Sequence, residues 1–546
     1  MPVVRTVGGL PPASLPAPPA GPPGQGDGRP GGPPVPAAAT VATAVAGVSR
    51  HGQPGPRTLR TARAIVQLAA AEVVGKLGTL VIVVGAARVL PLADFGVFSV
   101  ALAAGVVVAV VPSWGFDTIL IQRGAVRPGE LPTLLAQLLA LRAVVAAVVL
   151  AAVTAVVAAS GAPGPVVASV ACVVAACLAD TLADAYRSVA VACERQGIVA
   201  RAQVSQRAAT AVLALLALLL SRSLLQLSVA YLVGTLVGTV AVAAGSTRLG
   251  VRPCWRGVGW RGVGRLLRES WSAGAHSVAS MALFRADAML LAALAGAAAA
   301  GRYAAAYRLL ETVIFVCWTV ARAVFPVMVS ATDPAKVRRG ADRGLVVLAA
   351  AFLPYAALLW CRGGDVLRLL YGESFARASD TALIWLAPAP LVFGGAWLAA
   401  YVLQSGGPNP VVLIGSVGAL VVNIGLNLAL IPRYGPAGSA AATSISYTVE
   451  LALLYPPARA LVGPPKLLRP LLPALSGAAV LAAALLLPLP FAPALALGVA
   501  LYLVTWYILA GWVDPEQVDV MRGMLPRRGA ARPAVPAVTV AGEPPA

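Results

Sequence analysis

The chain has few charged residues, few histidines and no close pair of cysteines, and each shortage argues against a class of function. Only 11% of its 546 residues are charged, whereas a soluble domain carries roughly 25%. Two histidines, His51 and His276, and six cysteines without a C-x-x-C spacing argue against a zinc site. No G-x-x-x-x-G-K-[ST] motif for ATP and no nucleophile elbow occurs. We expect neither an enzyme nor a bound cofactor.

Apolar residues make up 59% of the chain, and its mean hydropathy is +0.84. A helix needs roughly 20 apolar residues to cross a bilayer. The sequence therefore predicts an all-α polytopic membrane protein with about fourteen transmembrane helices. Their expected positions are 65–87, 95–116, 133–158, 165–187, 203–221, 224–244, 270–293, 303–328, 344–361, 381–404, 410–431, 438–457, 470–489 and 493–512.

The formal net charge of +20 suits a membrane protein better than a nucleic-acid-binding protein, because no basic run alternates with aromatic residues. Arginines concentrate in every second loop between the predicted helices, for example between Arg252 and Arg268. Positively charged loops stay in the cytoplasm. This pattern predicts that the N-terminus and the C-terminus are both cytoplasmic.

Composition and a short repeat divide the chain. The motif G-x-[FY]-x-x-A opens the second predicted helix at Gly96 and the eighth at Gly301, six helices apart. Secondary transporters are commonly built from such duplicated halves, with the substrate site where the halves meet. The expected parts are a Pro/Ala/Gly-rich disordered cytoplasmic tail at 1–56, a six-helix bundle at 57–250, a second six-helix bundle at 251–462, two additional helices at 463–513, and a disordered cytoplasmic tail at 514–546.

The stretch VVNIGLNLALIPRYGPAGSAAATSISY (421–447) predicts a helix, a tight corner and a second helix. Asn423 and Asn427 lie four residues apart, so both amides project from one helix face, which should be turned away from lipid. We expect Pro432 to end the first helix and Gly435-Pro436 to form the turn. Small residues at every fourth position from Gly438 allow close helix packing.

This pattern, N-x-x-x-N-L-x-L-I-P-x-Y-G-x-x-G-x-A-x-A-T, resembles the late helix pair of polysaccharide-export flippases. These form the oligosaccharide flippase branch of the multidrug/oligosaccharidyl-lipid/polysaccharide exporter superfamily. Residues 284–311 and the outward loop at 370–375 resemble the same family, and the likeness covers roughly residues 60–460. The resemblance implies two six-helix halves that form a V around a central cavity, with the last two helices as additions.

Charged and amide side chains within the spans are the candidate site residues, because groups at that depth normally face the protein interior. Arginine matches phosphate oxygens with a planar fork that stays protonated. The candidates for a lipid pyrophosphate headgroup are Arg285, Arg308, Arg142 and Lys76. The candidates for sugar contacts are Asn423, Asn427 and Gln206, and those for a coupling H⁺ or Na⁺ are Asp287, Glu311 and Asp180.

Several of these charges also have a structural interpretation. Glu72 with Lys76, and Arg308 with Glu311, have the spacing of ion pairs within one helix. We interpret Arg187, Arg207 and Arg322 as topology signals near cytoplasmic helix ends.

The predicted function is secondary transport across the bacterial inner (cytoplasmic) membrane. The substrate would be a polyprenyl-pyrophosphate-linked oligosaccharide, flipped outward for surface polysaccharide biosynthesis. Membrane lipid and polysaccharide assembly proteins are the expected partners. The alternatives are a cation-coupled drug exporter of the same superfamily, a non-transporting membrane scaffold, and a glycosyltransferase or polymerase, which would need a larger outward loop than residues 362–380 offer.

Overall fold

The computed structural model describes Gly75 and residues 78–513, except 194, 257–258, 330, 332 and 408. The predicted tails and the beginning of the first predicted span, with Glu72 and Lys76, lie outside the described residues. Every regular element in the described part is a helix. The expected all-α polytopic class is confirmed.

The helices follow one another with short connections. They are Gly78–Val89, α3 Leu92–Ser113, α4 Phe116–Val126, η2 Pro128–Glu130, α5 Leu131–Ala159, α6 Gly164–Ala192, α7 Gln196–Ser221, α8 Leu224–Arg248, α9 Trp260–Val329, α10 Pro334–Tyr371, α11 Glu373–Leu386, α12 Ala389–Gln404, α13 Pro410–Val462, α14 Leu468–Leu485 and α15 Phe491–Val513.

Eleven stretches of the described chain are long and apolar enough to cross a membrane. Three of them contain one residue with non-helical dihedrals, Gly296 in α9, Arg362 in α10 and Gly435 in α13. We divide α9 and α13 at their glycines into two arms each, residues 260–295 and 297–329 in α9, and 410–434 and 436–462 in α13. The count of about fourteen spans stays a prediction.

The corner in α13 lies at Gly435, where the turn was expected, but the first arm ends later than expected. Pro432 does not end the first arm: the helix continues to Gly435, which has φ 55° and ψ −128°. Glycine reaches this conformation without the clash that a Cβ would cause. Gly438 then packs so closely that an added Cβ would lie 2.5 Å from the Leu430 carbonyl oxygen. The two arms are thus pressed together by a small residue, as predicted.

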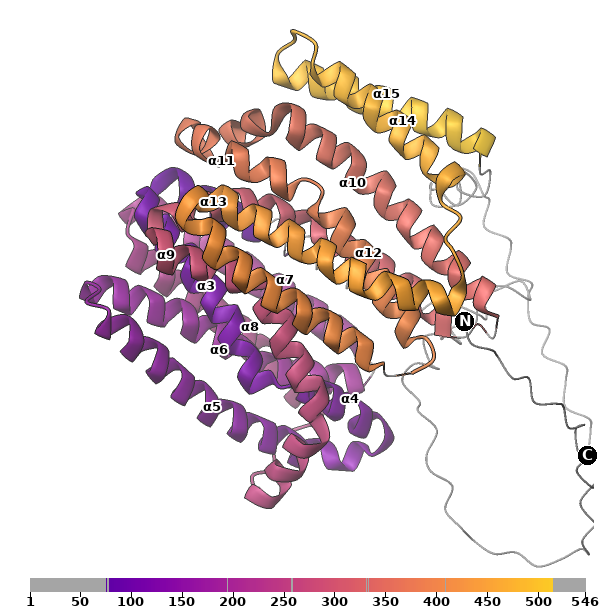
Figure 1. The fold of residues 1–546 in the computed structure, drawn as a ribbon. Helices are drawn as coiled ribbons and strands as arrows, with labels where there is room; N and C mark the ends of the chain where they lie inside the picture. Colours follow the sequence, from indigo (N-terminus) through magenta and orange to yellow (C-terminus); the bar gives the residue numbers. More distant parts are fainter. Residues whose placement is uncertain are drawn as a thin grey trace, which may run out of the picture.

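The helices form two groups, which Figure 1 shows in indigo to magenta and in magenta to orange. We call residues 78–248 the first half and residues 260–462 the second half. Within the first half, α6 and α7 pack on α8, and within the second half, α9 and α12 pack on α13. Helices α14 and α15 form a hairpin that reaches the rest of the molecule mainly through α10.

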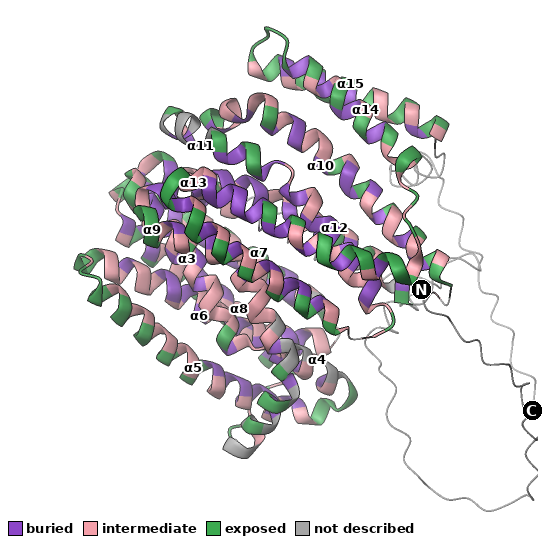
Figure 2. Ribbon diagram, in the orientation of Figure 1, coloured by how far each residue is buried: buried purple, intermediate pink, exposed green. Residues whose placement is uncertain are grey.

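Burial follows this arrangement. Long stretches of α12 and α13 are buried, whereas α5 and α15 carry many exposed apolar residues (Figure 2). Exposed Val, Leu and Ile side chains on such helices suit contact with lipid, since lipid tails are as apolar as they are.

The two halves meet most extensively where α3 crosses α9. A Cβ added at Gly96 would lie 1.8 Å from the Ala297 carbonyl oxygen, and one at Gly301 would lie 3.2 Å from Gly96 Cα. The glycines of the repeated motif therefore contact each other across the junction. Phe95 also meets Phe375 edge to face at 5.6 Å. A side chain at either glycine would separate the helices, which explains why the motif requires glycine.

Candidate transport site

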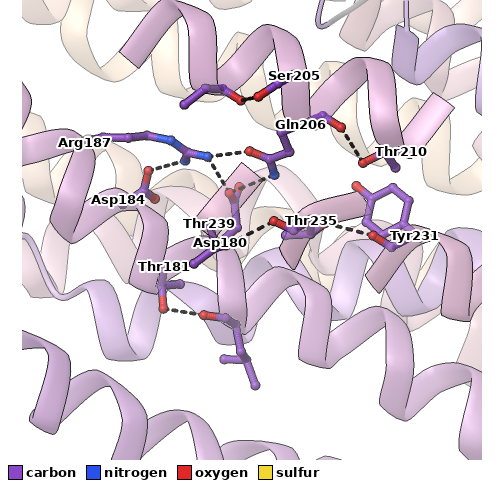
Figure 3. Close-up of polar contacts among 12 residues, drawn as sticks. Asp180, Thr181, Asp184, Arg187, Ser205, Gln206, Thr210, Tyr231, Thr235 and Thr239 are labelled. Atoms are coloured by element: carbon purple, nitrogen blue, oxygen red, sulfur yellow. Dashed lines mark hydrogen bonds and ion pairs between the residues drawn. The ribbon is translucent and has the colours of Figure 1, made fainter. Parts of the chain in front are cut away.

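A cluster of charged and amide side chains lies within the first half, between α6 and α7 (Figure 3). Arg187 donates to Asp180 at 2.8 Å and to Asp184 at 2.6 Å. Its side chain is only 11% exposed. Asp180, Asp184 and Arg187 share one face of α6 because they are spaced four and three residues apart. One arginine therefore forms ion pairs with two carboxylates.

Gln206 of α7 completes this first-half cluster. Its side-chain oxygen accepts a hydrogen bond from Arg187 at 2.6 Å, and its amide nitrogen donates to Asp180 at 3.0 Å. Gly238 lets α8 approach, since a Cβ there would lie 2.4 Å from Gln206 Cβ. The amide is thus held by packing and by two hydrogen bonds, so its orientation is fixed.

Arg142, a predicted headgroup ligand, lies in a separate buried position. Its side chain is 0% exposed, donates to Asp117 at 2.9 Å, and also donates to the Thr181 carbonyl oxygen. Ser188 donates to the same Asp117 oxygen at 3.0 Å. These contacts tie α4, α5 and α6 together. Because the guanidinium is enclosed within the first half, we leave Arg142 out of the proposed headgroup site.

The second half contains a cluster with the opposite ratio of charges. Arg285 of the first α9 arm and Arg308 of the second arm both pair with Glu311, Arg308 at 2.6 Å. The three side chains are 16%, 18% and 9% exposed. Two arginines therefore share this carboxylate, and the cluster keeps an excess of positive charge. The expected Arg308–Glu311 pair exists, and it extends to the other arm of the helix.

Arg285 is held over aromatic rings. Its guanidinium carbon lies 5.1 Å from the Phe284 ring centroid and 5.8 Å from that of Tyr307. Arg285 Nε is buried and makes no hydrogen bond within the described part of the chain. A buried donor without a partner costs free energy, so this nitrogen is suited to an acceptor that arrives with a ligand.

The two clusters are within electrostatic range of each other. Cys177 of α6 lies within electrostatic range of Asp180 and Arg207 in the first half and of Arg285 in the second. Tyr231 of α8 likewise feels both Arg207 and Arg308. Arg207 makes no ion pair or side-chain hydrogen bond with any residue that the structure describes. The region near Cys177 and Tyr231 is therefore where charges of both halves converge.

A third polar group fills the core of the second half. The Asp287 carboxylate accepts hydrogen bonds from Tyr303 and from the Ala288 backbone nitrogen, and lies 2.9 Å from the Thr443 hydroxyl. Ser439 donates to Asn427 at 3.0 Å, and its backbone oxygen lies 3.1 Å from the Thr443 hydroxyl. Oxygen atoms of four helical arms, two of α9 and two of α13, thus gather here, and hard cations prefer such oxygen ligands.

The predicted amides join this group. Asn427 donates to the Asn423 side-chain oxygen at 3.1 Å, and both residues are at most 1% exposed. Asn423 Nδ2 has no hydrogen-bond partner among the described residues. The expectation that this helix face avoids lipid is confirmed.

The structure brings most predicted site residues into these clusters, and it separates their roles. Gln206 contacts charges, whereas Asn423 and Asn427 belong to the Asp287 group. Lys76 lies outside the described residues. The interpretation of Arg187 as a topology signal missed its place in a buried cluster, although the spacing from Asp180 indicated a shared face. The same interpretation of Arg207 as a topology signal did not anticipate its position near Cys177 and Tyr231.

Residues 62–332 match a family model described as "Polysaccharide biosynthesis protein". Over these residues, which make up just under half of the chain, the protein is similar to that family. The match covers the first half, the α3–α9 junction and the Arg285–Glu311–Arg308 cluster. No curated protein matches this chain.

Solved structures show the fold of this chain. It is similar to the lipid II flippase MurJ in an inward closed conformation, at 10% identity and a TM-score of 0.64, covering 83% of this chain and 100% of that one. It is similar to an inward-facing multidrug resistance MATE transporter of the MOP superfamily, at 16% identity and a TM-score of 0.58, covering 73% and 98%. A MOP superfamily transporter from Pyrococcus furiosus gives 16% identity and 0.53, covering 73% and 95%. The chain therefore shares the fold of these three transporters.

Proposed function

We propose that this protein is a secondary transporter that flips a polyprenyl-pyrophosphate-linked oligosaccharide across the bacterial inner membrane. The family match and the fold support transport of material for polysaccharide assembly. The observation that carries the choice of substrate is the sharing of Glu311 by Arg285 and Arg308. Two arginines on one carboxylate leave positive charge in a poorly solvated place, and a pyrophosphate would neutralise it.

The headgroup site would extend from this cluster to Arg207. Arg207 and Arg308 lie within electrostatic range of the same Tyr231 side chain. A headgroup between them would contact both halves, and Gln206 with its charged neighbours offers hydrogen bonds to sugar hydroxyls. The lipid tail need not enter, because it can stay in the bilayer beside the helices.

Asp287 is the best candidate among the three carboxylates for the coupling cation. Glu311 pairs with two arginines and Asp180 with Arg187, whereas Asp287 forms no ion pair with any described residue. A carboxylate without a fixed cationic partner binds H⁺ or Na⁺ more readily than one that an arginine already neutralises. Asp287→Asn should abolish the dependence of transport on a proton or sodium gradient. Glu450→Gln, which changes a buried acid in a different helix, α13, should leave that dependence intact.

The test is flipping of a fluorescent polyprenyl-pyrophosphate oligosaccharide in sealed proteoliposomes that contain the full chain. Arg285→Gln and Arg308→Gln should each lower the initial rate by about tenfold or more, because a hydrogen bond to a charged group contributes roughly 1.5–3 kcal/mol. Arg368→Gln, at an exposed ion pair that belongs to neither cluster, is the matched control. Equal rates in all four proteins would overturn the proposed headgroup site.

A cation-coupled drug exporter is the second candidate. The two carboxylates around Arg187 favour it, since they leave negative charge in the first half. The same proteoliposomes, loaded with a cationic dye, distinguish the two. Dye efflux without lipid flipping would assign the exporter function, and flipping without efflux would assign the flippase function.

A further inference from the structure

An apolar groove runs between the body of the second half and the α14–α15 hairpin. It has a volume of about 660 Å³ and is walled by α10, α12, the second arm of α13 and the start of α14. Leu345, Leu353, Leu398, Leu451 and Leu471 are among its lining residues. None of the charge clusters described above lines it. Because α14 contacts the body mainly through α10, the groove occupies the space beside that contact.

One end of the groove carries two arginines. Arg338 is the first residue of α10 that lines the groove, and Arg459 lies in the last turn of α13. Arg338 reaches the Val462 carbonyl oxygen at only 3.5 Å, and its Nε is buried without a hydrogen-bond partner in the described chain. Arg459 has no side-chain partner among the described residues. The carboxylate at this mouth, Asp342, already accepts a hydrogen bond from the Lys466 backbone nitrogen at 3.1 Å.

The groove has the depth of one bilayer leaflet. Its lining residues on α10 extend from Arg338 to Leu353, which is about 22 Å along a helix at 1.5 Å per residue. The hydrocarbon core of a bilayer is roughly 30 Å thick, with headgroup regions on both sides. A groove that begins at the membrane surface with arginines and ends near the middle therefore matches a lipid of one leaflet.

We propose that this groove is a binding site for one anionic glycerophospholipid, with its phosphate at Arg338 and Arg459 and an acyl chain between α10, α12, α13 and α14. The arginines outnumber Asp342 at the mouth, so the site favours a net negative headgroup over a zwitterionic one. The acyl chain fills the apolar space under α14. The bound lipid fastens the α14–α15 hairpin to the second half. This site is independent of the proposed flipping function, because the two share no residue.

The test uses the purified full chain, stripped of lipid in detergent, and two probes with identical acyl chains, phosphatidylglycerol and phosphatidylcholine. Binding is measured by native mass spectrometry, and the thermal shift is measured alongside. Phosphatidylglycerol should bind wild type more tightly than phosphatidylcholine. Arg338→Gln with Arg459→Gln should weaken phosphatidylglycerol binding by about tenfold and remove the preference. Arg338→Lys with Arg459→Lys should keep the preference for phosphatidylglycerol, since both substitutions keep the positive charge.

Two controls make the result specific to the groove. Arg127→Gln with Arg433→Gln removes the same charge at exposed positions elsewhere and should leave binding unchanged. Gly395→Phe fills the groove, because a Cβ at Gly395 already contacts the Leu451 side chain at 3.5 Å, and it should weaken binding of both lipids. Equal binding of the two lipids to wild type, or loss of preference in the exposed control alone, overturns the proposal. Displacement of phosphatidylglycerol by an equimolar polyprenyl phosphate also overturns it, because the groove would then belong to the tail of a substrate.

Discussion

The two ion clusters use the same kinds of side chain in opposite ratios. In the first half, Arg187 forms ion pairs with both Asp180 and Asp184. In the second half, Glu311 forms ion pairs with both Arg285 and Arg308. The shared partners are similarly buried, Glu311 at 9% exposed and Arg187 at 11%, but the other members are more buried in the second half, where both arginines are below 20%, than in the first, where the aspartates are at 33% and 43%. Similar networks can therefore leave opposite charge for a ligand, and of the two clusters the one in the second half has the excess positive charge on which the proposed pyrophosphate site rests.

The largest effect should come from Glu311→Gln. Two arginines would lose their shared carboxylate in a poorly solvated place, and breaking a buried pair in this way costs about 3–5 kcal/mol. Thermal unfolding of the purified protein measures the loss. Glu311→Asp, which keeps the charge, should be destabilised far less. If the Gln and Asp variants unfold at the same temperature, Glu311 stabilises the protein through packing rather than through its charge.

Arg187→Gln should be the next most damaging change. It leaves Asp180 and Asp184 without their cation, but both carboxylates are more exposed than Glu311 and can recruit water. We expect a loss of roughly 2–3 kcal/mol, since solvent screening lowers the value of a partly exposed pair. The same unfolding measurement checks it, with Arg201→Gln, an exposed α7 arginine, as the control. A loss larger than that of Glu311→Gln would reverse the ranking of the two halves.

Gly96→Ala tests whether the halves are independent. The new Cβ would lie 1.8 Å from the Ala297 backbone, so α3 and α9 must separate, at a cost of about 1–3 kcal/mol. Gly425→Ala, with open space around its Cβ, is the matched control. Cysteine cross-linking across the junction should fall in the first variant only. Both ion clusters should survive, because each lies within one half.

The smallest effect should come from Arg368→Gln. Arg368 pairs with Asp365 and Glu373, but its side chain is 53% exposed. Exposed ion pairs contribute little because water and salt screen them. The melting temperature should stay within experimental error at physiological salt. A clear drop would show that ion pairs near the α10–α11 turn matter as much as the buried clusters do.

Much of the fold could be predicted because its signals are local. The apolar runs gave α7 and α8 on either side of Arg222, and the turn at Gly435 followed from Gly-Pro. The expectation that Pro432 ends the helix was wrong. A proline in the last turn of a helical arm is tolerated when neighbouring groups satisfy the freed backbone groups. The repeated glycines at 96 and 301 indicated two halves, and their contact across the junction explains the repeat.

The site was only partly predictable because its clusters join distant segments. The spacing of Asp180, Asp184 and Arg187 indicated one face of one helix, yet the pairing of Arg285 with Glu311 across the two α9 arms depends on the break at Gly296. Tyr303 meets Asp287 across the same break, and Thr443 meets it only after α9 and α13 pack together. Contacts between segments so far apart leave no periodic trace in the sequence.

The most direct test of the opposite charge ratios is binding of a short-chain prenyl pyrophosphate to the purified protein, measured by calorimetry. Arg308→Gln and Asp184→Asn each remove one of the two outer members of a cluster, and they change the charge in opposite directions. The account predicts that Arg308→Gln weakens binding by about tenfold or more, and that Asp184→Asn leaves it unchanged or tightens it. Weakening by Asp184→Asn alone would place the pyrophosphate with the first-half cluster and contradict the account.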